Sequence, residues 1–311
     1  MEKKATRESY GEGLIQLAEK RPDLIVLDAD LAAATKTGIF KKACPDKHFD
    51  CGIAEANMMG VAAGIASTGK LVFASSFAMF AAGRAFEIVR NSICYPKLNV
   101  KIGATHAGIS VGEDGASHQC NEDIALMTAL PNMTVINPAD DVEAKAAVLA
   151  MADYVGPTYM RFGRLAVPVF NDAATYKFEV GKGIQLKDGK DVTIIATGLM
   201  VAEAIEAGKA LAEQGVDARI INIHTIKPID RDIIIKAAKE TGKIITVEEH
   251  SVIGGLGSAV ANVVTEECPV PVIKIGVNDC FGHSGPAVAL LKEFGLCAEN
   301  IVNVTKAALG K

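Results

Sequence analysis

Short apolar runs rich in β-branched residues alternate along this chain with longer segments of helical periodicity. In the first half the candidate strands are 24–28, 71–75, 100–104, 134–137 and 158–162. The candidate helices between them include 54–67, 80–93 and 140–152. Strands that are apolar along their whole length must be covered on both faces, and strands that alternate with helices are typically parallel. The pattern therefore predicts an α/β fold built on a parallel sheet.

The alternation is interrupted once, by a polar, glycine-containing stretch, and then resumes. The later candidate strands are 192–197, 218–222, 243–249 and 271–276, with helices near 200–213, 230–240, 256–265 and 286–293. A chain of 311 residues has the length of about two domains. We therefore expect two successive parallel-sheet domains, at 1–170 and 191–311, joined by a linker at 171–190.

Composition excludes several classes of function. The 32 basic and 37 acidic side chains give a net charge of −5, which argues against a nucleic-acid partner. No apolar run reaches the roughly 20 residues of a membrane span, and the N-terminal segment lacks the apolar core of a secretory signal. The seven cysteines are scattered and never spaced as CxxC, so neither disulfides nor a zinc site is indicated. We expect a cytoplasmic protein that does not interact with membranes.

One carboxylate, Glu55, lies at the start of an otherwise apolar helix within the sequence CGIAEANM (51–58). Acidic residues in the first turn stabilise the helix dipole, which is the ordinary explanation for Glu55. A carboxylate with a chemical role is the alternative. The motif alone does not decide between them.

The segment 105–119, THAGISVGEDGASHQ, directly follows a candidate strand and contains two histidines, two acidic residues and three glycines. Open α/β sheets bind ligands at the carboxyl ends of their strands. His106, Asp114 and His118 are therefore candidate catalytic or substrate-binding residues. A solvated turn is the ordinary alternative, and no HExxH spacing supports a metal site.

Three further features have both structural and functional interpretations. Phe77 and Phe80 are spaced like a core-facing stripe, although they could also line a pocket. Arg161 and Arg164 close the last strand of the first domain, where an arginine could bind a phosphate or lie in solvent. The sequence GGLG (254–257) opens a helix, either as a phosphate loop or because glycines allow close packing, and it lacks both the Walker lysine and the full GxGxxG.

Taken together, these segments resemble the C-terminal half of transketolase, and most closely the separate C-terminal subunit of split transketolases. The resemblance covers nearly the whole chain and rests on GIAEANM (52–58), FASSFAMFAAGR (73–84), THAGISVGEDGASHQ (105–119), NPAD (137–140), Arg164 and FGHSG (281–285). It implies a pyrimidine-binding domain of the thiamine diphosphate fold followed by a transketolase C-terminal domain. The GDG motif of the diphosphate-binding domain is missing from the sequence. A partner subunit is therefore expected to supply the ligands of Mg²⁺ or Ca²⁺.

The resemblance also implies roles for the cofactor-binding residues. Glu55 matches the glutamate that hydrogen-bonds the aminopyrimidine ring of thiamine diphosphate and favours its imino form. Phe77 and Phe80 match aromatic residues that pack against this ring, and Asp30 matches an aspartate that lines the cofactor end of the cleft. A third aromatic residue expected in the family is replaced by Ala74.

For the substrate, the resemblance assigns contacts with the sugar and proton movement to His106, Asp114 and His118. Arg164 matches the arginine that holds the substrate phosphate. Ala34 occupies a position at which many full-length transketolases have a phosphate-contacting serine, so the way in which the phosphate is held is left open.

These assignments predict a metal-dependent transketolase subunit that transfers a two-carbon ketol unit between sugar phosphates of the pentose phosphate pathway. We expect a heterotetramer formed with an N-terminal subunit. The alternatives are the β subunit of a 2-oxo acid dehydrogenase, a deoxyxylulose-phosphate-synthase-like enzyme and a non-catalytic binding partner. The glutamate and histidine motifs favour a catalytic transketolase. The sugars, the stoichiometry and any ligand of the C-terminal domain are left open.

Overall fold

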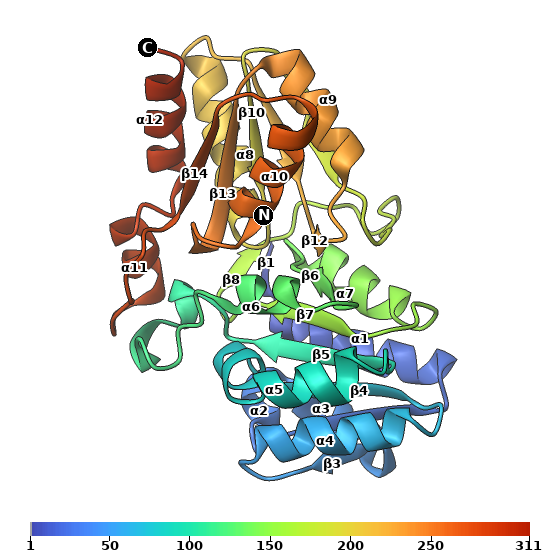
Figure 1. The fold of residues 1–311 in the computed structure, drawn as a ribbon. Helices are drawn as coiled ribbons and strands as arrows, with labels where there is room; N and C mark the ends of the chain where they lie inside the picture. Colours follow the sequence, from blue (N-terminus) through green and yellow to red (C-terminus); the bar gives the residue numbers. More distant parts are fainter. Residues whose placement is uncertain (1) are drawn as a thin grey trace.

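Seven strands form the sheet of the first domain, in the order β12-β6-β7-β5-β4-β2-β3. They are parallel, except that β12 runs antiparallel to β6. This computed structural model describes residues 2–311, and the first domain forms its lower part in Figure 1. The strands are β2 (Leu24–Asp28), β3 (His48–Asp50), β4 (Leu71–Phe77), β5 (Val100–Thr105), β6 (Thr134–Ile136), β7 (Thr158–Phe162) and β12 (Thr225–Lys227).

The sheet of the second domain has the order β14-β13-β10-β11-β9 and lies above the first in Figure 1. Four of its strands are parallel, and β9 pairs antiparallel with β11 at one edge. Its strands are β9 (Ile184–Lys187), β10 (Val192–Ala196), β11 (Ala218–Asn222), β13 (Ile244–Ser251) and β14 (Val272–Val277). A separate antiparallel pair joins β1 (Lys3–Ala5) to β8 (Ala166–Pro168).

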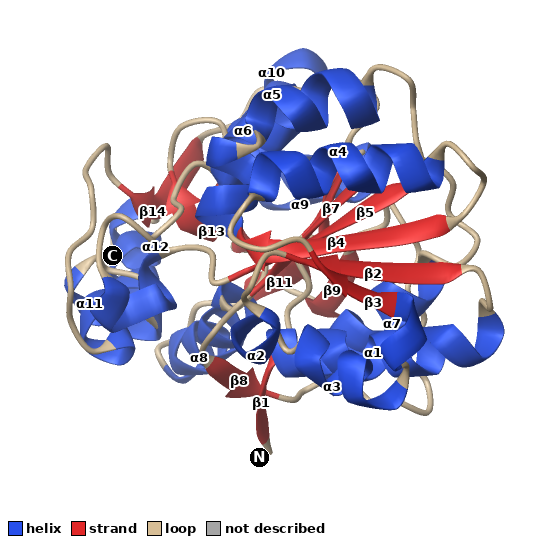
Figure 2. Cartoon of the chain, turned by 90° about the horizontal axis from the view of Figure 1, so that it is seen from below, coloured by secondary structure: helices blue, strands red, loops and turns tan. Residues whose placement is uncertain are grey.

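Helices cover both faces of the first sheet (Figure 2). On one face α1 (Thr6–Lys20), α3 (Thr37–Ala43) and α7 (Asp141–Ala150) enclose an apolar cluster with Tyr10 and Phe40. On the other face, α4 (Glu55–Ala66) and α6 (Asp123–Ala129) pack on a cluster that continues into α9 (Arg231–Thr241) and α10 (Leu256–Glu267) of the second domain. Apolar packing is therefore continuous between the two domains.

The remaining helices and helical turns belong to one domain each. The second domain also contains α8 (Met200–Glu213), α11 (Ala287–Glu293) and α12 (Ala298–Ala308). In the first domain α2 (Ala32–Thr35) follows β2, the 3₁₀ turn η1 (Pro45–Lys47) directly precedes β3, and the 3₁₀ segment η4 (Ile109–Asp114) follows β5.

The expected pair of parallel-sheet domains is confirmed, and each candidate strand ends within two residues of an observed strand. The strands β1, β3, β8 and β12 were not expected, because three residues carry too little periodicity to be recognised. Helix α1 was also not expected. Its Gly11 and Gly13 lower helix propensity, but they are needed because side chains there would overlap α3 and crowd Val148 of α7.

The structure differs from the single helix expected at 80–93. Two π-helical segments, η2 (Met79–Arg84) and η3 (Val89–Cys94), flank the short helix α5 (Phe86–Ile88). Gly83 allows the wider turn to close, because a side chain there would overlap the methyl group of Met79. Such π segments occur frequently at functional sites.

The segment expected to be a linker, 171–190, contains the strand β9 near its end. Residues 184–187 alternate in polarity as an edge strand does, and they add to the second sheet beside β11. The second sheet therefore begins inside this polar stretch.

Three further contacts tie the domains together. The strand β12 follows β11 in sequence but pairs with β6 of the first sheet. The ammonium of Lys227 on β12 donates to the carbonyls of Thr128 and Leu130 at 2.8 and 2.6 Å. The buried carboxylate of Glu143 on α7 accepts from the side chain of Asn222 on β11 at 2.8 Å. The domains therefore share a sheet edge as well as an apolar core.

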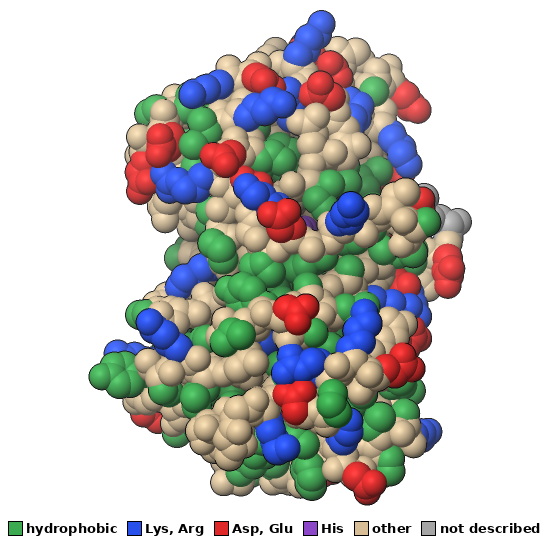
Figure 3. Space-filling model, turned by 90° about the vertical axis from the view of Figure 1, so that its right-hand side faces the viewer, with side chains coloured by type: hydrophobic (Ala, Val, Ile, Leu, Met, Phe, Trp, Pro, Cys, Tyr) green, Lys and Arg blue, Asp and Glu red, His purple; other side chains and the backbone are tan. Residues whose placement is uncertain are grey.

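The face drawn in Figure 3 shows acidic and basic side chains intermixed over both lobes, with apolar side chains gathered in the waist between them. Among the helices of residues 2–311, none combines the length and apolarity needed to cross a bilayer.

Gly103, in the centre of β5, should not tolerate a side chain. An added methyl group would overlap the ring of Tyr10, whose hydroxyl bonds Ser75 at 2.6 Å. We expect Gly103→Ala to lower the free energy of unfolding by about 1–3 kcal/mol, measured by urea denaturation followed by circular dichroism. Gly163→Ala is the control, because its methyl group would meet only Thr6 at 3.8 Å. Equal stability of both variants would contradict this packing.

Candidate active site

The carboxyl ends of the parallel strands of the first sheet gather most of the candidate residues. Phe77 ends β4, His106 directly follows β5, Arg164 follows β7, and Glu55 begins the helix after β3. Asp30 follows β2. Because parallel strands end at the same edge of a sheet, the topology brings together residues that are far apart in the sequence.

An aromatic cluster forms the centre of the site. The Phe77 ring stacks on the His106 imidazole with a centroid distance of 3.9 Å, and on Phe80 at 5.8 Å. The His118 ring meets Phe80 edge to face at 5.3 Å. Phe77 and Phe80 thus contact each other and the two candidate histidines.

Glu55 is a buried carboxylate beside this cluster. It is the first residue of α4 and only 1% exposed, whereas stabilising a helix dipole requires no burial. Its Oε2 pairs with Nη1 of Arg84 at 2.8 Å, and the guanidinium of Arg84 lies 4.5 Å from the centre of the Phe80 ring. The arginine side chain is 52% exposed, so this ion pair lies at the boundary between the protein and solvent.

His106 is held as a neutral imidazole. It is 3% exposed, and burial, assisted by the charges of Arg7, Arg164, His118 and Lys36, lowers its pKa to about 3. Arg7 can only donate, so Nε2 accepts from Arg7 Nη1 at 3.2 Å. The proton therefore lies on Nδ1, which is 2.9 Å from the Thr105 hydroxyl.

Arg7 is a site residue that the sequence interpretation missed. It lies on α1, ninety-nine residues from His106, and also donates to the Ala34 carbonyl at 2.8 Å. Burial lowers the pKa of Arg7; Glu8 offsets this effect and the nearby charge of Arg164 adds to it. Two guanidinium groups placed close together favour an anionic ligand. No motif marks Arg7, and the pattern of α1 did not reveal its helix.

The two arginines near the end of β7, Arg161 and Arg164, have different environments. Arg161 is buried, with Nε 2.8 Å from Asp123 and Nη2 2.8 Å from the Glu249 carbonyl, so it holds protein segments together. Arg164 lies at the rim of the site, where Nη1 donates to the Val111 carbonyl and to Glu113 Oε2, the latter at 2.7 Å. Its side chain is half-buried, which leaves it accessible to a ligand.

The other candidates lie around this centre. Asp114 is exposed at the end of η4, and His118 is half-buried with Nδ1 2.9 Å from the Ser117 hydroxyl. Asp30 lies further out, exposed at the end of β2, with its amide donating to Asp50 at 2.9 Å. Ala74, which stands where the family has a third aromatic residue, is fully buried in the apolar core.

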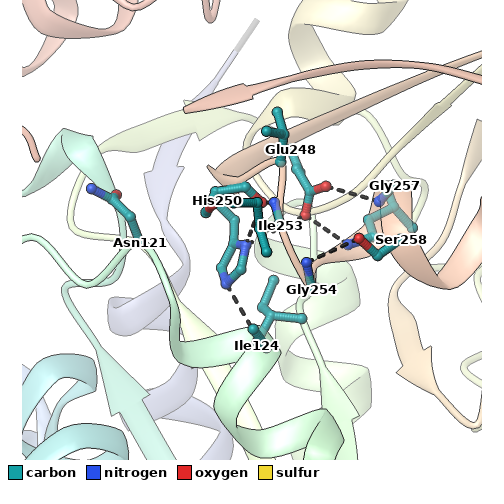
Figure 4. Close-up of polar contacts among 12 residues, drawn as sticks. Asn121, Ile124, Glu248, His250, Ile253, Gly254, Gly257 and Ser258 are labelled. Atoms are coloured by element: carbon teal, nitrogen blue, oxygen red, sulfur yellow. Dashed lines mark hydrogen bonds and ion pairs between the residues drawn. The ribbon is translucent and has the colours of Figure 1, made fainter. Parts of the chain in front are cut away.

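The glycine sequence 254–257 is not a phosphate loop. The carboxylate of Glu248 occupies the start of α10, accepting from the amides of Leu256 at 2.6 Å and Gly257 at 2.8 Å (Figure 4). A side chain at Gly255 would overlap this carboxylate, and one at Gly257 would crowd Thr246. The glycines therefore serve close packing, because the helix N-terminus already holds an anion from its own chain.

The charge and hydrogen-bonding groups of the site suit an anionic, hydroxyl-rich ligand next to an aromatic, acid-bearing pocket. Within residues 2–311, no three His, Cys, Asp or Glu side chains are grouped so as to hold a metal ion.

Comparison with known proteins gives consistent results for both domains. The family model of the transketolase pyrimidine binding domain matches residues 2–169, and that of the transketolase C-terminal domain matches residues 181–301. A protein from Methanocaldococcus jannaschii, provisionally named a transketolase C-terminal section, is 53% identical over 300 residues, which cover 96% of this chain and 94% of the relative.

Two further proteins are similar over nearly their whole length. A subunit of a 6-deoxy-6-sulfo-D-fructose transketolase from a Clostridium species is 43% identical, covering 95% of this chain and 92% of the relative. A solved split-gene transketolase, described as an inactive β4 tetramer, has a TM-score of 0.92 and 55% identity, covering 98% of both chains.

Proposed function

This chain belongs to the transketolase family, and on that basis we propose that it is the C-terminal subunit of a split transketolase. The proposed reaction transfers a two-carbon ketol unit between sugar phosphates, with thiamine diphosphate bound in an active site shared with an N-terminal subunit. One observation carries the proposal: the carboxylate of Glu55 is almost completely buried beside an aromatic and cationic cluster, where parallel strands end.

The residues present fit the aminopyrimidine end of this cofactor. A buried carboxylate is costly unless it is paired, and Glu55 pairs with a half-exposed arginine. In the proposal, Glu55 holds a proton at the pyrimidine ring, while Phe77 and Phe80 pack against that ring and Asp30 lines the outer part of the cleft. Thiamine diphosphate, when bound, stabilises the carbanion character that ketol transfer requires.

We assign the diphosphate and its Mg²⁺ or Ca²⁺ to the partner subunit. This assignment is supported by relatives described as a C-terminal section and as a split-gene transketolase.

The substrate residues divide by charge. Arg7 and Arg164 supply positive charge for a phosphate. In the proposal these two charges hold the phosphate without the serine hydroxyl that is missing at Ala34, whose carbonyl accepts from Arg7. His106, with its pKa lowered to about 3, remains neutral at physiological pH and acts as a hydrogen-bond partner, not as a cation. Asp114 and His118 lie closer to solvent, where they can contact the sugar hydroxyls and exchange protons.

Self-association is the remaining part of the proposal. The outer face of α4 is open: Val61 is 38% exposed, and added methyl groups at Gly60 or Gly64 would meet no atom within 4 Å. The similar split-gene protein is described as a tetramer. We propose that two copies of this chain and two N-terminal subunits form the enzyme, acting in the cytoplasm on pentose phosphates.

Reconstitution tests the split active site. The purified chain with Mg²⁺ and thiamine diphosphate should not turn over a ketose phosphate in a coupled assay, and addition of the N-terminal subunit should restore transfer to an aldose phosphate. Turnover by the chain alone would overturn the proposal. A mixture that assembles and binds the cofactor without transfer would instead favour the non-catalytic alternative.

Glu55→Gln should slow exchange of the cofactor's C2 hydrogen for deuterium by about 10²–10⁴-fold in the assembled enzyme, because an amide cannot share the proton. Hydrogen exchange followed by NMR after acid quench measures this rate, and sedimentation checks assembly. Asp141→Asn is the matched control, since Asp141 is also an acid in a first helical turn, that of α7. If the two variants behaved alike, Glu55 would serve only its helix.

Arg164→Ala should raise KM for phosphorylated ketoses about 10- to 150-fold, the value of one charge-assisted contact, with little change for hydroxypyruvate. Steady-state kinetics with both donors measure the difference, and Arg90→Ala, at an exposed position on η3, is the control. The same comparison with a sulfonated ketose is informative, because the Clostridium relative is named for such a sugar. Equal losses with phosphorylated and unphosphorylated donors would make Arg164 structural.

A further inference from the structure

The end of β13 brings three consecutive titratable residues into the interior between the domains. Glu248, Glu249 and His250 are all at least nine-tenths buried. Successive residues of a strand point to opposite faces. Figure 4 shows Glu248 and His250 beside the helices α10 and α6, where His250 Nε2 accepts from the amide of Ala125 at 3.3 Å. Glu248 and His250 therefore bind these helices, whereas the side chain of Glu249 points to the opposite face of the strand.

Glu249 contacts the segment that carries the candidate active site. Its Oε1 accepts from the amide of Ser110 at 2.6 Å, across 139 residues of sequence. Ser110 is the second residue of η4, which begins three residues after His106 and ends at Asp114. A side chain at Gly108 would overlap the Glu249 carboxylate, so the backbone of this segment lies directly against it.

The surroundings of Glu249 suit a positioning role. Arg161 on β7 donates to the Glu249 carbonyl at 2.8 Å and to Asp123 on α6, so the strand position is fixed by a buried ion pair. The side chain of Gln119 makes a second tie between domains, donating to the carbonyls of Ile109 and His283 at 3.2 and 3.0 Å.

We infer that Glu249 is a positioning residue, through which the second domain holds η4 and thereby aligns His106 and Asp114. The effect of Glu249 on catalysis, through the positions of His106 and Asp114, rests on the proposed function. The holding of η4 itself can be measured without any activity.

The inference implies a pH dependence. Burial raises the pKa of Glu249 to about 7, although Arg161 and the hydrogen bond from Ser110 oppose the shift and Asp123 adds to it slightly. Above pH 7 the carboxylate is therefore ionised, and its charge-assisted hydrogen bond is about twice as strong as a neutral one. Below pH 7 the group is protonated and holds Ser110 more weakly. His250 does not interfere, because burial lowers its pKa.

Hydrogen exchange at the Ser110 amide tests the inference in the assembled enzyme and in the chain alone. At pH 8, Glu249→Gln should reduce protection of this amide about 5- to 10-fold after correction for intrinsic exchange rates, and at pH 6 it should match the wild type. In activity, kcat/KM of the wild type should fall by a similar factor from pH 8 to pH 6, while the variant should remain low and flat.

Glu248→Gln is the matched control. Glu248 lies on the same strand, its pKa is likewise raised by burial to about 7, and its hydrogen bonds go to α10 instead of η4. This variant should keep the pH dependence of Ser110 protection. A loss of that dependence in both variants, or its presence in Glu249→Gln, would overturn the inference.

Two measurements guard against misfolding and against failure of the proposed function. If Glu249→Gln does not fold, Glu249→Asp keeps the charge but shortens the side chain, and should weaken Ser110 protection at both pH values. Wild-type protection that does not fall from pH 8 to pH 6 contradicts the inference without any variant. If the assembled wild type transfers no ketol unit, the proposed function fails, whereas the exchange results still decide whether Glu249 holds η4.

Discussion

The buried guanidinium of Arg161 is the contact on which the arrangement of this molecule depends. It is joined to Asp123 of α6 and to the backbone of Glu249 on β13. A buried charge is strongly destabilising when one partner is removed, so these three segments cannot separate without a large cost. Since β7 and α6 belong to the first domain and β13 to the second, this network fixes the domain orientation and the position of η4 between them.

The electrostatics of the site are organised before any ligand binds. The charge of Arg164 contributes to the lowered pKa of Arg7, and both arginines act on His106, which stays neutral instead of adding a third charge. Preorganised dipoles and charges of this kind need no rearrangement when an anion arrives. The free energy of desolvating the Arg7 guanidinium is lost when the protein folds, because folding partly buries this charged group.

The main strands could be predicted because each is apolar along its length, and the two domains because a polar stretch interrupts the alternation of strands and helices. The site could be located because parallel strands end at the same edge of a sheet. For Glu55 and the histidines, the family resemblance then favoured the functional interpretation over the ordinary structural one. Arg7 escaped prediction because its helix contains glycines and its contact with His106 spans ninety-nine residues. The strand pattern alone could not distinguish Arg161 from Arg164. The resemblance selected Arg164, and only the packing of α6 and β13 shows that Arg161 is buried.

The crossing of β12 into the first sheet limits how a gene for this protein could be divided in evolution. The sheet of the first domain has β12 as its edge strand, and β12 follows β9, β10 and β11 of the second domain in sequence. A gene fission between the two domains would leave β6 as an open edge, and such an edge invites pairing with foreign strands. A break of the chain between the two domains would therefore separate β12 from the sheet that it completes.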